Sequence, residues 1–349
     1  MSARKLHSIA EALRQEIVTG VFQPGDRLPT QEELKLRTGV AAATVQRLFN
    51  LLSAEGFIVP RGSAGTFVAD SPPHLCRYGI VFADYPLGRP PNGTFNSVLA
   101  GQCQIMQQRR EQDITVYAGL DGHKDVPDYR RAVRELETHR VAGLMVACNP
   151  VMLEGTPLLE RAGLPRVVVG GRSLHDLPVV TTDPFSWPEK ALDYMAARGR
   201  QRVAVVAMAI GQELFARFDE LMAERGIMTK PHWRLQVHRG LAEGARNPVH
   251  LLMEARERPD GLLITDDVFA EHATMGILDA GLSIPDDIDV VSHCNFPVLK
   301  RSVLPIKRLG FPVAEVLQKS LEVIDMQRQG IEPPPFTGIQ AMFEEELTS

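Results

Sequence analysis

The apolar positions near the start of this sequence recur every three or four residues, first over residues 6–19 and again over residues 42–55. This spacing predicts two helices, each with one buried stripe. Between them, Thr30 and Glu33 have the spacing of a capping box, which predicts a further short helix that ends near Gly39. The beginning of the chain is therefore expected to form a compact helical unit.

The short helix and the helix at 42–55 are separated by a tight, glycine-containing turn, which is the arrangement of a helix-turn-helix. In that arrangement the second helix lies in the major groove of DNA. If its apolar stripe faces the interior, its opposite face presents side chains that contact bases. Glutamine pairs with adenine, arginine with guanine, and alanine or threonine methyl groups with thymine. The candidate contacts on this helix are Ala43, Thr44, Gln46, Arg47 and Asn50.

Two short β-like runs follow, at residues 57–60 and 66–69, and they flank the segment RGSAG. They predict a two-stranded ribbon, or wing, beside the DNA-reading helix. The tip carries one cation and two glycines, so it is suited to contact phosphates or to enter the minor groove. The candidate DNA contacts of the ribbon are Arg61, Ser63, Gly65 and Thr66.

A polar, proline-containing break at 70–77 separates this unit from the rest of the chain. We therefore expect a DNA-binding domain at 1–69, a hinge-like linker at 70–77 and a larger domain at 78–349. In the larger domain, short apolar runs alternate with amphipathic stretches, which predicts parallel sheets with connecting helices, an α/β architecture. The runs fall into two groups divided near 179–190, which predicts two doubly wound lobes with a ligand cleft at the carboxyl ends of the strands.

The individual elements expected in the larger domain follow from these runs. The strand-like runs are 77–83, 114–119, 141–148, 165–171, 202–209, 234–238, 260–265 and 288–293. The helix-like stretches are 95–111, 127–139, 186–198, 212–225, 245–257 and 267–280.

Composition and the absence of several motifs exclude some classes of function. The chain has 349 residues, 44% of them hydrophobic, and its four cysteines form no CxxC pair, so we expect a cytoplasmic protein with reduced thiols. No run approaches the ~18 apolar residues of a membrane span, and no signal peptide is found. The motifs GxGxxG, GxxxxGK[ST] and GxSxG are absent, so we expect no enzyme, catalytic residue, cofactor or metal site.

The net charge of −5 argues against a protein that coats nucleic acid, but it allows a small DNA-reading module on an acidic body. Over residues 1–70, eight Lys or Arg residues face seven Asp or Glu residues, a net charge of 8 − 7 = +1. Few phosphate contacts are therefore available to one such module, and we expect either a modest affinity or a dimer that engages two half-sites.

Residues 6–68 resemble the winged helix-turn-helix of the GntR family of bacterial repressors. The shared markers are IVTG before PGDRLP, GV before the reading helix, TV, LSAEG and GTFV. The resemblance implies a DNA-binding repressor head. The chain departs from the family pattern in two places: Ser-Glu-Arg becomes Thr30, Gln31 and Glu32, and Ser-Arg followed by Arg becomes Ala41, Ala42 and Gln46.

Residues 78–345 are similar to the effector-binding module of the LacI/GalR repressors, which resembles periplasmic sugar-binding proteins. The markers are VVTTD, ARGRQRVAVV, ITDDVFAEHATMGILDAGLSIPDDIDVVSHCN and IKRLGFPVAEVL. The combination of a GntR head with this module is that of arabinose-type repressors. It implies a two-lobed, periplasmic-binding-protein-like domain.

Strand ends and this resemblance together give the candidate effector contacts. They are Asp84, Asn149, Arg172, Asp183, Arg217, Arg239, Asp266, Asp267 and Asn295. Carboxylates and amides of this kind bind sugar hydroxyls. However, the Gly-Phe-Asp-Asp of the family becomes Ser-His-Cys-Asn, so that Cys294 replaces the usual hydroxyl-binding aspartate.

These patterns lead to one hypothesis and two alternatives. The hypothesis is a homodimeric transcriptional repressor that binds a double-stranded DNA operator and responds to a sugar or sugar-like molecule in the interlobe cleft, with no membrane partner. In the first alternative, the larger domain is a dimerisation scaffold without a small-molecule ligand. In the second, the winged helix serves protein contacts instead of DNA.

Overall fold

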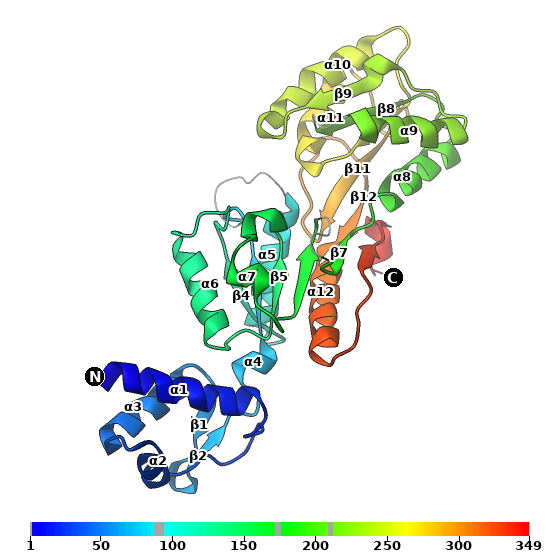
Figure 1. The fold of residues 1–349 in the computed structure, drawn as a ribbon. Helices are drawn as coiled ribbons and strands as arrows, with labels where there is room; N and C mark the ends of the chain where they lie inside the picture. Colours follow the sequence, from blue (N-terminus) through cyan, green and yellow to red (C-terminus); the bar gives the residue numbers. More distant parts are fainter. Residues whose placement is uncertain (1, 87–93, 172–175, 209–211, 349) are drawn as a thin grey trace. The chain divides into compact units, whose positions relative to one another are not determined.

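The structure is a computed structural model that describes residues 2–86, 94–171, 176–208 and 212–348. No helix within these ranges is both long and apolar enough to cross a lipid bilayer. The chain forms two compact units, whose elements Figure 1 shows from blue to red in chain order. Unit 1 comprises Met1–Tyr85, Cys103–Val179 and Ser320–Pro335, and unit 2 comprises Pro86–Gln102, Val180–Lys319 and Phe336–Ser349.

The N-terminal part of unit 1, which we call the head (residues 2–69), contains the predicted helices. They are α1 (Ser2–Val18), α2 (Gln31–Thr38) and α3 (Ala42–Ala54). Figure 1 shows α1 and α3 side by side, and apolar side chains of all of these helices share one core. The predicted capping box is confirmed: the Thr30 hydroxyl accepts from the N–H of Glu33 (3.3 Å), and the Glu33 carboxylate accepts from the N–H of Thr30 (2.7 Å).

A buried arginine joins α1 to the end of α3. Arg14 is 0% exposed, although it lies among the apolar side chains of the α1 stripe. Its guanidinium donates two hydrogen bonds of 2.9 Å to the two carboxylate oxygens of Glu55, which caps α3, and a third of 2.9 Å to Glu11. Because such paired bonds are directional, they fix the packing of α1 against α3. The sequence pattern did not predict this pair.

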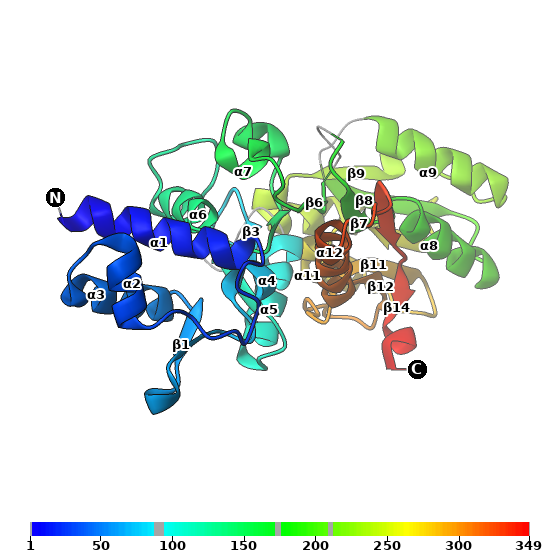
Figure 2. The same ribbon diagram turned by 60° about the horizontal axis from the view of Figure 1, so that its bottom comes forward.

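The antiparallel ribbon predicted after α3 is confirmed. Its strands β1 (Ile58–Pro60) and β2 (Thr66–Val68) are joined by a 3₁₀ turn, η1 (Gly62–Ala64). Gly65, at the end of this turn, has φ of 110°, a conformation that favours glycine. Figure 2 shows the ribbon and its turn extending beyond the helices of the head. We call residues 58–68 the wing.

The predicted linker contains more structure than a hinge. A four-residue helix, α4 (Pro73–Cys76), leads directly into the first strand of the sheet. Within it, the ring of His74 stacks on Phe57 of the head at 6.0 Å between centroids. Burial lowers the pKa of His74 to about 4, so this ring is neutral at physiological pH. Proline suits the first turn of such a helix, and the role of residues 70–77 as a linker stays a prediction. The domain boundaries themselves stay a prediction.

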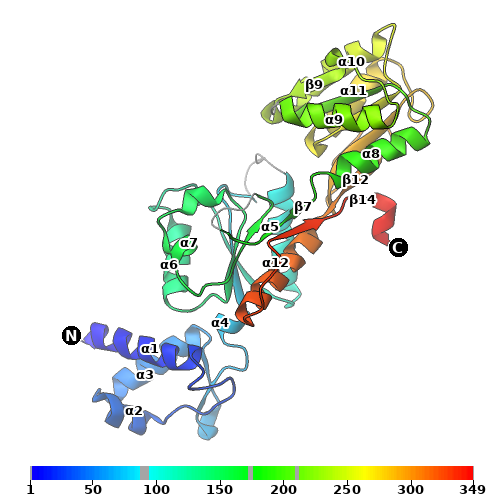
Figure 3. The same ribbon diagram turned by 45° about the vertical axis from the view of Figure 1, so that its right-hand side comes forward.

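The first of the large sheets has the strand order β13-β7-β6-β5-β3-β4. Its elements are β3 (Arg77–Val81), α5 (Thr94–Gln108), β4 (Asp113–Tyr117), α6 (Pro127–Glu137), β5 (Gly143–Val146), α7 (Pro157–Glu160), β6 (Arg166–Val169), β7 (Val179–Thr182), α12 (Val313–Arg328) and β13 (Phe336–Ile339). Figure 3 shows α6 and α7 on one side of the strands and α12 on the other. On the α12 side, a Cβ added at Gly143 would lie 2.2 Å from Ile324, so the helix approaches the strand closely.

The second large sheet, in unit 2, has the strand order β14-β12-β11-β10-β8-β9. Its elements are α8 (Ser186–Ala197), β8 (Val203–Met208), α9 (Gln212–Glu224), β9 (Arg234–Val237), α10 (Arg246–Glu254), β10 (Gly261–Ile264), α11 (Ala270–Asp279), β11 (Asp289–Phe296), β12 (Lys307–Pro312) and β14 (Met342–Phe343). The strands from β12 to β9 in this order are parallel.

Alternating side chains of β8 build a core on each face of this sheet. Val203 and Val205 pack with α8 and α9, whereas Ala204 and Val206 pack with α10 and α11. Figure 1 shows these helix pairs on opposite sides of the strands. The predicted doubly wound α/β class is confirmed. The strand-like and helix-like runs did not include β7, β12, β13, β14, α4, α7 or α12. Of these, β13, β14, α4 and α7 have two to four residues, too few to carry a period.

The Arg14–Glu55 pair gives a testable prediction for the stability of the head. Replacing Glu55 by alanine leaves a buried guanidinium without its main partner, which costs about 3–5 kcal/mol. Hydrogen exchange of the α1 and α3 amides in the full-length protein measures this loss locally. Glu11→Ala is the matched control: it removes the exposed partner of the same arginine and is expected to cost at most about 1 kcal/mol. Equal protection of these amides in both variants would contradict the stabilising role of the Arg14–Glu55 pair.

Candidate functional site

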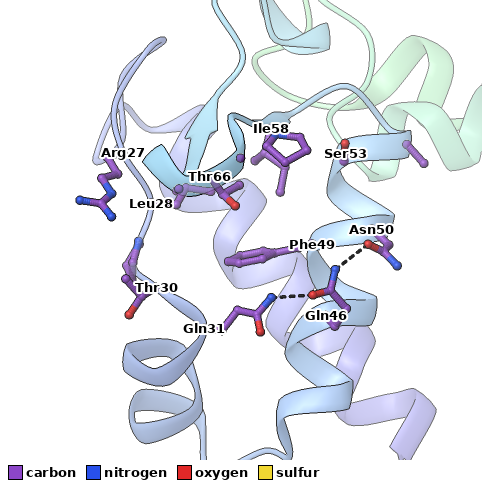
Figure 4. Close-up of a pocket in the computed structure, with 15 residues that line it drawn as sticks. Arg27, Leu28, Thr30, Gln31, Gln46, Phe49, Asn50, Ser53, Ile58 and Thr66 are labelled. Atoms are coloured by element: carbon purple, nitrogen blue, oxygen red, sulfur yellow. Dashed lines mark hydrogen bonds between the residues drawn. The ribbon is translucent and has the colours of Figure 1, made fainter.

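The exposed side of the head contains a pocket of about 660 Å³. The start of α2, one face of α3 and the wing surround it, as Figure 4 shows. Its lining residues are Arg27, Leu28, Pro29, Thr30, Gln31, Gln46, Phe49, Asn50, Ser53, Ala54, Ile58, Pro60, Gly62, Gly65 and Thr66. Polar side chains from separate segments of the head therefore meet around one concave surface.

The outward face of α3 has the composition that the sequence predicts. Val45, Leu48 and Leu52 are buried in the core of the head, whereas Gln46 and Arg47 are exposed. Of the other predicted contacts, Ala43, Asn50, Arg61 and Ser63 are exposed, and Thr44, Gly65 and Thr66 are half-buried. Those that line the pocket are Gln46, Asn50, Gly65 and Thr66. The orientation of the helix is confirmed, and the DNA contacts stay a prediction.

Three amide side chains form a chain of hydrogen bonds along one rim of the pocket. The Gln31 amide nitrogen donates to the Gln46 oxygen at 2.5 Å, and the Gln46 nitrogen donates to the Asn50 oxygen at 2.9 Å. Figure 4 shows both bonds and places Gln31 on α2, opposite the α3 residues. The predicted set included Gln46 and Asn50 but not Gln31, because nothing in the sequence shows which side chain of α2 reaches α3.

The cation predicted at the wing tip already has partners. The Arg61 guanidinium pairs with Asp70 at 3.2 Å and lies over the ring of Phe67, 4.8 Å from its centroid. A DNA phosphate has to compete with Asp70 for this side chain. The competition is weak, because an exposed ion pair is worth only about 0–1 kcal/mol.

A cation that sequence reasoning missed lies beside the wing. Arg27 is exposed, lines the pocket and bridges through its backbone to Phe67 of β2. A Cβ added at Gly65 would lie 2.9 Å from Nε of Arg27, so the glycine gives the guanidinium room above the ribbon. In the sequence, Arg27 is a single arginine between a turn and Leu28-Pro29. A single arginine in such a place does not by itself predict a DNA contact.

Ion pairs use most of the positive charge of the head. The pairs are Arg14 with Glu55 and Glu11, Lys35 with Glu32, Arg37 with Glu16, and Arg61 with Asp70. Among the head side chains that the structure describes, Arg27, Arg47 and Lys5 form no ion pair. The cations available to an anionic partner thus include Arg27, which lines the pocket beside the wing, and Arg47, which is exposed on α3.

Unit 2 contains a second, smaller cavity of about 170 Å³ at the carboxyl ends of its strands. Its lining residues are Thr182, Asp183, Pro184, Trp187, Pro188, Met208, Phe218, Thr265, Asp266, His293 and Phe311. The cavity combines an aromatic wall with two carboxylates, and its volume is near the ~150 Å³ of a cavity that holds one six-membered ring. Two predicted effector contacts, Asp183 and Asp266, are therefore brought together.

The carboxylate of Asp183 is fixed and ionised. One oxygen accepts from the N–H of Phe185 at 2.9 Å and the other accepts from the Gln340 side chain at 2.8 Å. Burial alone would raise the pKa of Asp183, but these bonds and one from the N–H of Ser186 hold it below its usual value. The ionised carboxylate is thus available as an acceptor on the wall of the cavity.

Two other predicted effector residues bind each other below the surface instead. Asp267 is 1% exposed and accepts hydrogen bonds from Thr94 (2.6 Å) and Asn295 (3.2 Å). Cys294, at the position of the family's aspartate, is also buried, and its thiol donates to the carbonyl of Val298. Burial, with the nearby Asp267 carboxylate, raises the pKa of the Cys294 thiol to about 12. In this structure Asp267 and Asn295 therefore bond to each other within unit 2, and their contact with a ligand stays a prediction.

The remaining predicted effector residues are distributed over both units. Arg217, on α9, is outside the cavity lining and pairs with Glu220 (3.1 Å) and Glu189 (3.6 Å). Asp84 and Asn149 are exposed after the neighbouring strands β3 and β5 of unit 1. Arg172 lies outside the described residues, and so does the side chain of Arg239, whose backbone begins the turn η4 (Arg239–Ala245). In the described part of the chain, no cluster of His, Cys, Asp or Glu side chains is arranged to hold a metal ion.

Comparisons with known families match both parts of the chain. Bacterial regulatory proteins of the gntR family match residues 6–68, and a periplasmic binding protein-like domain matches residues 192–336. The HTH-type transcriptional regulator YdcR of Escherichia coli is 38% identical over 340 residues, which cover 89% of this chain and 69% of YdcR.

Solved structures support the fold of the larger part. The Escherichia coli transcriptional repressor ascG matches 77% of this chain and 97% of its own, with a TM-score of 0.59 and 15% identity. A LacI family regulator from Lactobacillus casei with bound glucose covers 77% of this chain and 98% of its own, with a TM-score of 0.54 and 16% identity. The head, the doubly wound sheets and the relative along most of the sequence agree: the chain belongs to the gntR family of HTH-type transcriptional regulators, with a periplasmic-binding-protein-like domain after the DNA-binding head.

Proposed function

We propose that this regulator is a homodimeric repressor that reads a double-stranded operator with α3 and responds to a small molecule held in the unit 2 cavity. It acts in the cytoplasm, where its operator lies. The observation that carries the proposal is the outward face of α3, where Gln46 and Arg47 stand exposed above a fully apolar inner stripe.

The beginning of α3 is suited to approach DNA closely. Ala41, Ala42 and Ala43 are exposed and small, and Ala41 caps the helix without a side-chain hydrogen bond. The first N–H groups of the helix therefore need an outside acceptor, and a phosphate oxygen is a good one. Beyond this first turn, Gln46 and Arg47 carry the donors and acceptors that distinguish adenine and guanine in the major groove.

The unit 2 cavity supports an effector of modest size. Trp187, Phe218 and Phe311 give it an aromatic wall, and the carboxylates of Asp183 and Asp266 accept hydrogen bonds from hydroxyl or N–H groups. The similar Lactobacillus casei regulator was solved with bound glucose. A ligand changes operator binding only if it prefers one of two conformations of the regulator, so we expect it to shift a population that already exists.

An exposed apolar surface on unit 2 supports a homodimer. Leu278 of α11, Val298, Leu299 and Val303 are 52%, 42%, 45% and 41% exposed. Val303 lies against α11, because its N–H donates to the Thr274 hydroxyl at 3.1 Å, one turn before Leu278. We call Leu278 and Val303 the α11 patch; Val298 and Leu299 are further exposed apolar side chains of unit 2. A second copy of the chain would cover this patch and supply a second DNA-binding head. Because one head carries little positive charge, we expect two heads to bind two half-sites together.

The scaffold alternative remains, and one observation favours it. Cys294 replaces the family's aspartate, and Asp267 and Asn295 bind each other, so the hydroxyl-binding groups of unit 2 are fewer than the sequence suggests. Ligand binding, tested below, separates the two functions.

The DNA proposal predicts two kinds of effect from arginine and glutamine variants. After selection of an operator from random duplexes, Gln46→Ala and Arg47→Ala should each cost about 1–3 kcal/mol and relax the preference at one base pair. Arg27→Ala should weaken all sequences equally and reduce the slope of log affinity against log salt by about one unit. Gel-shift titrations at several salt concentrations measure both.

Arg37→Ala is the matched control, since Arg37 is a cation of α2 that already pairs with Glu16. It should leave base preference unchanged. If neither Gln46→Ala nor Arg47→Ala alters operator affinity, α3 is not the reading helix.

The effector proposal predicts that a ligand changes the fluorescence of Trp187. The chain has two tryptophans, and Trp233 is fully buried away from the cavity, so Trp233→Phe leaves Trp187 as the reporter. Sugars, sugar acids and nucleosides are screened by thermal shift, and each hit is titrated against the emission of Trp187. Asp183→Asn should weaken the hit at least about tenfold, the loss of one charged hydrogen bond. A screen without any hit supports the scaffold instead, and a hit that leaves Trp187 emission unchanged argues for a site elsewhere.

The dimer proposal predicts that a charge in the α11 patch separates the protomers. Leu278→Glu would bury an unpaired carboxylate in the interface, which costs far more than the leucine contributes. Sedimentation velocity should find a dimer for the wild type and a monomer for this variant. Met228→Glu is the control, because Met228 is equally exposed (52%) elsewhere on unit 2. A wild-type monomer, or a dimer that survives Leu278→Glu, would contradict the assignment.

A further inference from the structure

The amide chain on the rim of the head pocket has a direction. Gln31 donates through its nitrogen to the oxygen of Gln46, and Gln46 donates through its nitrogen to the oxygen of Asn50. The Gln46 side chain is exposed and has several rotatable bonds, yet it is held at both its oxygen and its nitrogen. Neither partner is on the same turn: Gln31 comes from α2, and Asn50 lies one turn further along α3.

We call the two hydrogen bonds that hold the Gln46 amide the clamp. The clamp leaves hydrogen-bonding groups of Gln46 free to contact a base. An amide oxygen has two lone pairs and an amide nitrogen has two hydrogens. The bonds to Gln31 and Asn50 use one of each, so one lone pair and one N–H remain. A glutamine contacts N6 and N7 of adenine through one acceptor and one donor, so the number of unused groups is sufficient for this pairing. Because Gln31 donates to the oxygen end, the clamp also decides which end of the amide is the acceptor.

We propose that Gln31 is a positioning residue for DNA recognition: it fixes the rotamer and the donor–acceptor sense of the Gln46 amide, so that the head reads one A·T base pair of its operator. The inference rests on the proposed function of α3. It extends that function to a residue of α2 outside the predicted DNA contacts.

One observation and one physical argument support a role of Gln31 in positioning the Gln46 amide. The position of Gln31 is itself fixed, because it is the first residue of α2 and follows the capping-box residue Thr30. An exposed hydrogen bond contributes little to stability in water, but its contribution grows when DNA binding removes the water around it. In addition, a Gln46 side chain that is already ordered loses less conformational entropy when it binds DNA.

The test compares base preference, not affinity alone, in the full-length protein. The base pair read by Gln46 is identified first, as the pair whose discrimination is lost in Gln46→Ala. Gln31→Leu, which keeps most of the bulk of the side chain but removes its donor, should reduce discrimination at that pair by about 2- to 12-fold, the cost of ordering one long side chain. Preference at the other positions of the operator should stay unchanged.

Gln31→Glu gives the sharper result. A carboxylate at this position can only accept, so it retains a hydrogen bond to Gln46 only if the Gln46 amide turns over. The preferred base at that pair should then change. The added negative charge weakens binding to all duplexes alike, and it cancels in the ratio of affinities. Gln15→Leu, an exposed glutamine of α1, is the matched control and should preserve every preference.

The outcomes separate the inference from the function on which it depends. If Gln46→Ala relaxes one base pair but Gln31→Leu and Gln31→Glu keep the wild-type preference there, the positioning role is wrong and the α3 function stands. If the wild type selects no sequence, or Gln46→Ala changes no preference, the proposed function fails and this inference fails with it.

Discussion

The burial of one stripe of α3 is the constraint on which the rest of the head depends. Val45, Leu48 and Leu52 pack into a core shared with α1 and α2, and a helix with 3.6 residues per turn then has to present Gln46 and Arg47 to solvent. Turning α3 by one residue would expose these apolar side chains at about 1.5–3 kcal/mol each. No single base contact, worth about 1–3 kcal/mol, can reverse that choice. Packing therefore decides which side chains are offered to DNA.

The same division between packing and recognition holds in unit 2. Successive residues of β8 belong to cores on opposite faces of the sheet, so the strand interior is fully used for packing. Polar groups are left for the strand ends, where Asp183 and Asp266 line a small cavity. Others at the same edge, such as Asp267 and Asn295, satisfy each other, because a carboxylate buried without a partner is costly. A polar residue at a strand end is thus only a candidate until its partners are known.

Local patterns in the sequence were enough for most of the elements and for the orientation of α3. The capping box at Thr30, the apolar period of residues 42–55 and the glycines around the wing each act over a few residues, and the structure confirms them. What could not be predicted depends on pairs distant in sequence. Arg14 meets Glu55 across 41 residues, and Gln31 meets Gln46 across 15. The position of Arg27 at the pocket also requires the fold, because it follows from a backbone bridge to β2.

The most direct test of the central claim is a crystal structure of the full-length protein bound to its selected operator. The account predicts that α3 lies in the major groove, with Gln46 and Arg47 at hydrogen-bonding distance from base edges and Arg27 at a phosphate. A complex in which α3 stays outside the groove, with these side chains in solvent, would contradict it.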